Sequence, residues 1–452
     1  MKIASLVRRT PFVPSASTVD RLTADDDLFV KLDTILGMPV VMQTVWRFPG
    51  TVDVDALRGV AERMLTGRMS RLVGRHRGPG RAYWRYTPEA GSVTVAAEPI
   101  PAGGEEAWAR AQTDLPLDVV TGPAWRFAVA RVADGSAVLV SLTIAHVIAD
   151  GGSGTLAVME AVHDLKYTPG TEPDLVDDAI DAADLLGSAA STAYRVWQES
   201  RTETPVTPER VTGTPAPDTD LATAQATPNV TVLVPANDFT AAAKARGGTD
   251  NSLFAALMVG LLERCGRVSK GDVMPLSLPV STRTDPADRR ANATSGARAY
   301  IEVSPSRYDD LTDIRVACKE AYERLAVRPG TVANRAVIMQ ALPQAAARRL
   351  AAQATNPLCL ASNVGHVPDF FATLGTGVPA DLAVRAVTAA DDVTLLRDAK
   401  GGISGWLAIN NGDVMFSVSS LDPVRIPDVA ALRTLVTDEL ATWGLTGRSW
   451  GA

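Results

Sequence analysis

The chain has 452 residues, 46% of them hydrophobic, with 44 Lys and Arg against 51 Asp and Glu. A net charge of −7 argues against nucleic acid as a partner, because a phosphate-binding surface needs clustered basic residues. Residues 1–9 lack the apolar core of a signal peptide, and no segment approaches the roughly 18 apolar residues of a membrane span. We therefore expect a cytoplasmic protein without integral membrane association.

In the first half of the chain, Asp53 is expected to cap a helix that continues to Thr66. The Arg-rich stretch Arg68–Arg85, which contains His76, favours a solvated hairpin, with phosphates of coenzyme A or of a carrier protein as the alternative ligand. The run Ala137–Ala145 is apolar and rich in β-branched residues, which predicts a strand buried on both faces. After it, Ser153 is expected to cap the next helix.

A stretch dense in Pro and Thr, residues 202–228, predicts a connector between two domains, residues 1–201 and 229–452. In the second half, Thr249 and Asp250 open an apolar, buried helix, and Val273–Val280 is expected to form a strand. Asn411-Gly412 predicts a tight hairpin. Strands and helices alternate in both halves, so the predicted class is α/β or α+β.

The segment that carries chemistry is Ile144–Gly154. His146 stands at the end of the predicted buried strand, and its imidazole can accept a proton near neutral pH. Asp150 follows four residues later, held by Gly151 and Gly152, and would point back toward the core, where it needs a cation. The sequence predicts a functional His at the edge of a sheet.

This segment, HVIADGGSG, resembles the HxxxDG signature of the CoA-dependent acyltransferase superfamily, which includes chloramphenicol acetyltransferase, condensation domains, polyketide-associated acyltransferases and wax ester synthases. Three further pieces resemble other motifs of the group. They are Leu22-Thr23-Ala24-Asp25 with Leu28-Phe29, then Leu278–Arg283 with Asn292, and Ser362-Asn363-Val364-Gly365. Together they span nearly the whole chain.

The resemblance implies two chloramphenicol acetyltransferase-like domains, each a sheet flanked by helices, with a tunnel between them that contains His146. The resemblance assigns His146 as the general base. It implies that Asp150 and Gly151 are structural and that Asp150 pairs with Arg283 to hold the loop of His146 in place. Ala145 stands where many relatives have a first His of a tandem pair, as in branches with a single His. Candidates for lining the tunnel or stabilising an oxyanion are Ser362, Asn363, Gly365, His366 and the backbone near Gly151.

Other sites are disfavoured. His163 and His366 are expected at the surface or in packing, although His366 could line the tunnel. Residues 375–380 imitate a dinucleotide fingerprint, but Pro379 interrupts the helix that such a site requires. No GxSxG or HExxH motif occurs, and Cys265, Cys318 and Cys359 are too far apart for a disulfide framework or a metal knuckle. We therefore expect no metal, no permanently bound cofactor and no acyl-enzyme.

The predicted function is transfer of an acyl group from a thioester to a small-molecule alcohol or amine, in one ternary complex. Coenzyme A or phosphopantetheine would carry the acyl group as co-substrate, and an acyl carrier protein is a possible partner. The alternative is a condensation-like domain that has lost acyl transfer and serves as a binding platform or in another reaction. A monomer is the default, since the two halves bury each other.

Overall fold

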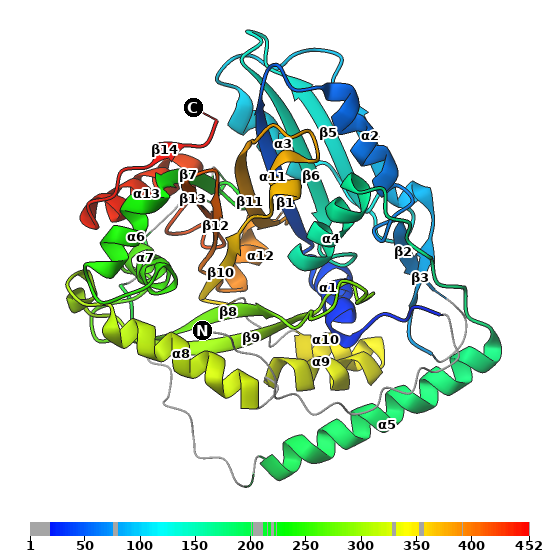
Figure 1. Cartoon of the computed structure of the whole chain (residues 1–452). Coiled ribbons are helices and arrows are strands. Elements are labelled where there is room, and N and C mark those ends of the chain that lie inside the picture. Colours follow the sequence, from blue (N-terminus) through cyan, green and yellow to red (C-terminus); the bar gives the residue numbers. More distant parts are fainter. Residues whose placement is uncertain are drawn as a thin grey trace.

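A computed structural model describes residues 19–75, 80–199, 201, 211–214, 216–217, 221–222, 224–327, 331–351, 357–390 and 392–451 (Figure 1). The chain forms two lobes, each built on a mixed sheet with helices against it. None of the helices in these ranges is both long and apolar enough to cross a membrane. The signal-peptide prediction for residues 1–9 and His76 lie outside the described residues.

The first lobe contains a five-stranded sheet in the order β11-β1-β6-β5-β4. Its strands are β1 (Val40–Pro49), β4 (Gly91–Val95), β5 (Trp125–Arg131), β6 (Ala137–Ala145) and β11 (Asp381–Thr388). Only β4 and β5 are parallel neighbours. A separate hairpin, β2 (Arg71–Gly74) with β3 (Tyr83–Tyr86), lies beside this sheet.

The second lobe contains a seven-stranded sheet in the order β14-β7-β13-β12-β10-β8-β9. Its strands are β7 (Asn229–Pro235), β8 (Val273–Ser281), β9 (Thr294–Glu302), β10 (Cys359–His366), β12 (Ile403–Asn410), β13 (Asp413–Ser420) and β14 (Arg448–Ser449). In this sheet β10 runs parallel to both of its neighbours. Figure 1 shows β8 and β9 reaching from this lobe toward α1 and α4 of the first lobe.

The α-helices of the first half are α1 (Ala24–Leu36), α2 (Val54–Met64), α3 (Glu105–Asp114), α4 (Gly151–Val162) and α5 (Leu175–Glu199). Those of the second half are α6 (Ala236–Lys244), α7 (Asp250–Arg264), α8 (Thr312–Val327), α9 (Thr331–Ala341), α10 (Gln344–Ala351), α11 (Asp369–Thr373), α12 (Val393–Asp398) and α13 (Val429–Thr442). Short 3₁₀ turns occupy Pro88–Ala90 and Pro305–Tyr308.

The elements with the clearest local patterns are confirmed. β6 has the predicted bounds and is buried along its whole length, since its alternate faces pack toward α2 and α4 and toward α3. Helix α7 starts after a Thr249 cap, and its residues from Ser252 to Leu262 are buried. At the β12–β13 turn, Asn411 and Gly412 both have positive φ, as a type I′ turn requires.

One predicted cap is wrong. Helix α4 starts at Gly151, and its cap is Asp150, whose carboxylate accepts a 2.6 Å hydrogen bond from the Ser153 backbone N–H. Ser153 therefore lies inside the first turn of the helix. Gly151 and Gly152 are the first two residues of the helix.

The Arg-rich stretch is a hairpin as predicted, but it is not solvated throughout. Arg68 and Arg71 are buried and reach loop 282–293, which joins β8 to β9. Arg68 pairs with Glu160 and donates to the carbonyls of Pro286 and Asp288. Arg71 donates to the carbonyls of Ile148 and Arg289 and to the Ser153 hydroxyl. These guanidinium groups hold the second half of the chain against the first.

The predicted division at residues 202–228 remains a prediction, and much of that connector lies outside the described residues. The sheets do not follow the division strictly, because β11 comes from the second half and pairs along its length with β1 in the first lobe. The lobes are thus joined by an exchanged strand as well as by loop 282–293.

Candidate active site

His146 lies at the point where β6 ends and the chain turns toward α4. Its backbone N–H donates to the Val40 carbonyl at 2.9 Å, which continues the pairing of β6 with β1 by one residue. Val147, Ile148 and Ala149 are buried in the core of the first lobe. The turn is therefore anchored on both sides of the imidazole.

Asp150 joins this turn to loop 282–293. Its backbone N–H donates to the Ala291 carbonyl, while its carboxylate accepts from the Ala293 N–H at 2.7 Å and from the Thr294 hydroxyl at 3.3 Å. Arg283 Nη2 lies 3.2 Å from one carboxylate oxygen, and both side chains are 6% exposed. The structure thus brings Asp150 and Arg283 together across the two halves.

Arg283 is itself held by its own loop. Its guanidinium donates to the carbonyls of Asp288 and Arg290. Gly152 leaves room for this approach, because a Cβ atom there would lie 3.3 Å from Arg283 Nε and 3.4 Å from an Asp150 oxygen. A Cβ at Gly151, by contrast, would meet nothing within 4 Å. Gly152 is thus the position at which a side chain would crowd the Asp150–Arg283 pair.

The residue that touches the imidazole from loop 282–293 is Asn292. Its Oδ1 lies 3.0 Å from His146 Nδ1, and it is almost completely buried. Its amide nitrogen donates to Asp26 Oδ1 at 2.9 Å and to the Val147 carbonyl at 3.1 Å. Asp26 also accepts from the Asn292 backbone N–H at 2.8 Å. These bonds fix which way the amide faces.

This orientation decides the tautomer of His146. Since both contacts of Asn292 Nδ2 are to acceptors, that atom is the NH₂ group and Oδ1 faces the ring. A carbonyl oxygen only accepts, so Nδ1 of His146 must carry the proton. Nε2 is then the unprotonated nitrogen, and it makes no hydrogen bond within the described ranges of the chain. The geometry therefore places the ring proton on Nδ1 and leaves the lone pair of Nε2 free.

Phe29 of α1 covers the ring. The two ring centroids are 3.8 Å apart and the rings are stacked at 13°. Burial lowers the pKa of His146 below its usual value of 6.5, an effect opposed first by a hydrogen bond to its own backbone and then by the Asp150 charge and the Asn292 hydrogen bond. The net direction favours a neutral imidazole at pH 7.

Helix α1 supplies the support behind this arrangement. Asp26 forms a reciprocal capping box with Thr23, in which each side chain accepts from the other residue's backbone N–H. Burial raises the pKa of Asp26. The neighbouring Asp25 has its pKa raised to about 6, first by burial and then by the charge of Asp26.

The other predicted site residues lie on or near β10. The Asn363 side chain donates to Asn251 Oδ1 and accepts from the Gly365 N–H, at a point where the register between β10 and β12 shifts. His366 is exposed and lines a hollow of about 400 Å³ with Lys244 and Asp250. No hydrogen bond or ring contact joins these residues, or Ser362, to His146 in the described part of the chain. Their place in a tunnel remains a prediction.

The three cysteine thiols lie apart from His146 as protonated, largely enclosed groups. All three cysteines are free, and Cys318 and Cys359 are buried. Burial raises the pKa of Cys265 and of Cys318 to about 11, and it raises that of Cys359 further. Thiols that stay protonated at neutral pH are poor nucleophiles.

Phe29 and Asn292 belong to the sequence motifs, but the motifs predicted no task for either residue, and no feature of the sequence singled out Asp26. The available signal was the resemblance itself: the α1 motif and the Leu278–Arg283 motif with Asn292 both supply residues at His146. Nothing in the spacing showed that Asn292 and Asp26, 266 positions apart, meet beneath the imidazole.

Comparisons with known proteins bear on the fold of the chain. No protein-family model matches the sequence, and no curated protein resembles it significantly in sequence. Solved structures do match. The first condensation domain of the calcium-dependent antibiotic synthetase, in complex with a substrate analogue, superposes with a TM-score of 0.61 at 15% identity, covering 94% of this chain and 96% of that one.

The chain has the condensation-domain fold. The condensation domain of the Monacolin K polyketide synthase MokA matches with a TM-score of 0.57 at 14% identity, covering 94% and 96% of the two chains. The wax ester synthase/diacylglycerol acyltransferase from Marinobacter aquaeolei VT8 matches with 0.55 at 14% identity, covering 94% and 98%. These are the groups that the sequence motifs resemble, so the predicted fold class is confirmed.

We predict that Asp150 and Arg283 are strongly coupled in stability. Arg283→Ala leaves the buried Asp150 charge without a cation, which costs about 3–5 kcal/mol of the free energy of unfolding. In Asp150→Ala the guanidinium keeps a second partner, the Asp288 carboxylate 3.5 Å away. Asp150→Ala with Arg283→Ala should cost much less than the sum, as measured by chemical denaturation. The exposed pair Asp164–Lys166 serves as a control, with a coupling of at most about 1 kcal/mol. Additive losses at Asp150 and Arg283 would contradict the pairing.

A second prediction concerns Asp25. Its raised pKa means that the folded protein is destabilised by the ionised carboxylate above pH 6, and that this penalty fades as the pH falls from about 6 toward 3.8. Asp25→Asn should raise the free energy of unfolding at pH 8 by about 1 kcal/mol, allowing for partial exposure, and by less at pH 4.5. Asp55, the exposed second residue of α2, provides the matched variant Asp55→Asn, which should not stabilise. A gain that is equal at both pH values would contradict the assignment.

Proposed function

We propose that the protein is an acyltransferase that moves an acyl group from a thioester to an alcohol or amine, with His146 as general base. The observation that carries the proposal is the hydrogen bond between Asn292 Oδ1 and His146 Nδ1, which leaves Nε2 unprotonated. The match to condensation domains and to a wax ester synthase supports the reaction class.

In the proposed reaction Nε2 takes the proton of the acceptor O–H or N–H as that atom attacks the thioester carbonyl. The tetrahedral intermediate collapses by breaking the C–S bond. The departing thiolate takes the proton from Nε2, so the products are an ester or amide and a free thiol. Throughout, Asn292 accepts from Nδ1–H and keeps the ring in place, while the Asp150 charge favours the transient imidazolium.

The thioester would be carried by coenzyme A or by the phosphopantetheine of an acyl carrier protein, the donors that the resemblance implies. The oxyanion needs donors of its own. Gly151 is a candidate, because α4 begins there and the first N–H groups of a helix have no partner within it. Ser362 and Asn363 on β10 are the alternative donors, in a tunnel between the two lobes.

Acyl transfer should depend on His146. In an assay with a panel of acyl-CoAs and carrier-bound thioesters against alcohols and amines, His146→Ala should reduce kcat by about 10²–10⁴-fold. His163→Ala is the matched control, because His163 is an exposed ring at the end of α4 and should leave the rate unchanged. Turnover that survives His146→Ala would refute the assignment and favour a binding platform.

Asn292 should affect the reaction by holding His146 in its Nδ1–H tautomer. Asn292→Ala removes the acceptor for Nδ1–H, so kcat should fall about 10- to 100-fold while KM changes little. Because the lowered pKa keeps His146 neutral, the acid limb of the wild-type kcat/KM profile should lie below pH 6.5. Asn410→Ala, a partly buried Asn on β12, should leave both rate and profile unchanged. An Asn292→Ala variant with wild-type kcat would contradict this role.

A further inference from the structure

Helix α5 exposes large apolar side chains to solvent. The side chains it buries against the body include Asp178 and Asp181, which are 3% and 7% exposed and pair with Arg21 and Arg81. Leu185 and Val196 are half-buried on the same inner side, yet several large apolar side chains face outward. Val176 is 65% exposed, Ile180 59% and Tyr194 58%. In a soluble protein the apolar face of a helix is normally the buried one.

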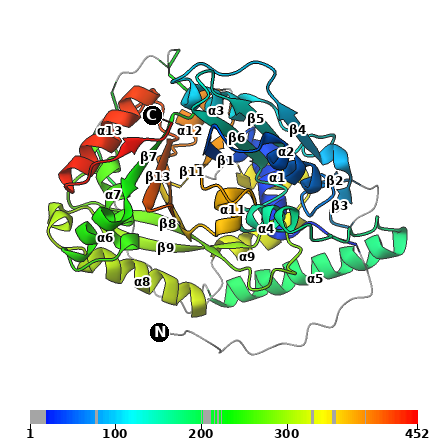
Figure 2. The same ribbon diagram turned by 45° about the horizontal axis from the view of Figure 1, so that its top comes forward.

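These outward residues form one straight stripe. Its members are spaced by alternating steps of four and three, the period at which one helix packs lengthwise on another. They are all exposed, and they are Val176, Ile180, Ala183, Gly187, Ala190, Tyr194 and Trp197. We call them the α5 stripe; at 1.5 Å per residue it is about 32 Å long. Figures 1 and 2 both show α5 along the outer edge of the molecule.

The α5 stripe is nearly symmetric about Gly187. Bulky residues stand at both ends and small ones at the centre. A second copy of the helix, running antiparallel, would place Val176 opposite Trp197 and Ile180 opposite Tyr194. Ala183 would face Ala190, and Gly187 would face its own counterpart. Self-complementarity of this kind is what a two-fold interface between identical chains requires.

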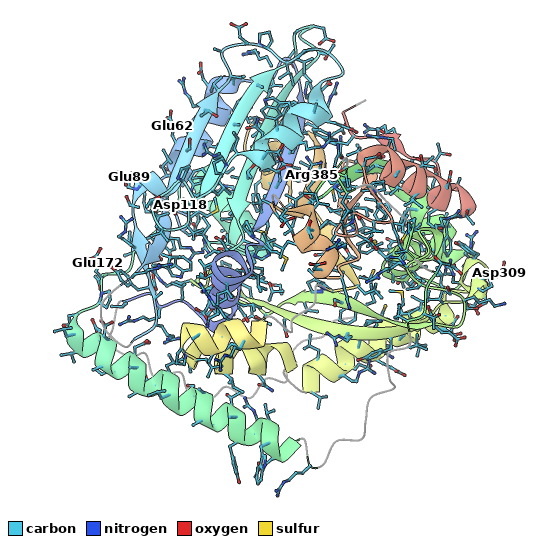
Figure 3. The ribbon with its side chains drawn as sticks, turned by 180° about the vertical axis from the view of Figure 1, so that it is seen from behind. Glu62, Glu89, Asp118, Glu172, Asp309 and Arg385 are labelled. Carbon is cyan, nitrogen blue, oxygen red and sulfur yellow. The ribbon has the colours of Figure 1, made fainter. Side chains whose placement is uncertain are left out.

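The charges at the two ends of α5 are also complementary. Glu172, Asp174 and Asp177 surround the start of the helix, and Figure 3 shows Glu172 at that end. Arg195 and Arg201 lie at the other end, where the Arg201 guanidinium stacks on the Trp197 ring, 3.8 Å from its centroid. Antiparallel pairing brings the acidic end of each helix to the basic end of its partner, and it opposes the helix dipoles favourably.

From these observations we infer that the protein forms a two-fold dimer through antiparallel contact of the α5 stripe with a second copy of this chain. Small residues at the centre let two helices approach closely, and a Cβ atom at Gly187 would meet nothing within 4 Å of its own chain. An anionic membrane or an acidic carrier protein fits less well, because acids surround one end of the stripe. The expectation of a monomer was based only on the contact between the two halves of the chain and did not include the α5 stripe.

Sedimentation equilibrium of the full chain tests the inference. The wild type should approach twice 47.6 kDa at tens of micromolar, whereas Gly187→Glu should weaken association at least about tenfold, because it places two like charges at the two-fold axis. Ser188→Glu is the matched control. Ser188 is exposed and lies off the α5 stripe, one helical turn from Asp184. The Ser188→Glu variant therefore adds the same charge to the helix outside the proposed interface. It should associate like the wild type.

Cross-linking tests the direction of the helices. Ala183→Cys and Ala190→Cys variants, treated with a short thiol cross-linker, should give covalent dimers when mixed and few when treated separately. Parallel pairing would reverse that result. The proposal would be overturned if the wild type stayed monomeric at about 100 μM, or if Gly187→Glu and Ser188→Glu affected association equally. It would also be overturned if the chain proved to be a monomer that binds anionic vesicles through α5. None of these outcomes depends on acyl transfer.

Discussion

The carboxylate of Asp150 binds residues from both halves of the chain and so joins them at the candidate site. It starts α4, accepts the Ala293 N–H and pairs with Arg283, so the turn that carries His146 and loop 282–293 share one anchor. Arg68 and Arg71 hold the same loop from the other side. Because this loop is fixed, Asn292 reaches His146 Nδ1. The geometry around His146 therefore depends on contacts between segments more than a hundred residues apart.

Local pattern predicted the elements whose burial follows from their own residues. β6 is apolar at almost every position and covered on both faces, and the Asn411-Gly412 turn needs only two residues that tolerate positive φ. The cap of α4 was misplaced because Asp150 and Ser153 are both good caps and the sequence does not show which one ends the turn. Arg68 and Arg71 looked like surface charges because the carbonyls they bind lie about 220 positions away.

In the candidate site, too, some residues could be predicted from the sequence and others depend on distant contacts. Resemblance to a family pointed to His146, Asp150 and Arg283, which the structure brings together. The tautomer of His146 depends on Asp26 and Asn292, and no periodicity links these two. Helix α5 escaped prediction for a further reason. Apolar residues lie on both sides of this helix, and two buried aspartates paired with Arg21 and Arg81 lie on its inner side, so its pattern does not show which face is buried.

The central claim is that His146 is held as the Nδ1–H tautomer with Nε2 free. ¹⁵N NMR of protein labelled in its four histidines reports the protonation of each ring nitrogen directly, and loss of one signal pair in His146→Gln assigns it. The account predicts that at pH 7 His146 is neutral with its proton on Nδ1, and that it becomes charged only below pH 6.5. A ring protonated on Nε2, or charged at pH 7, would contradict it.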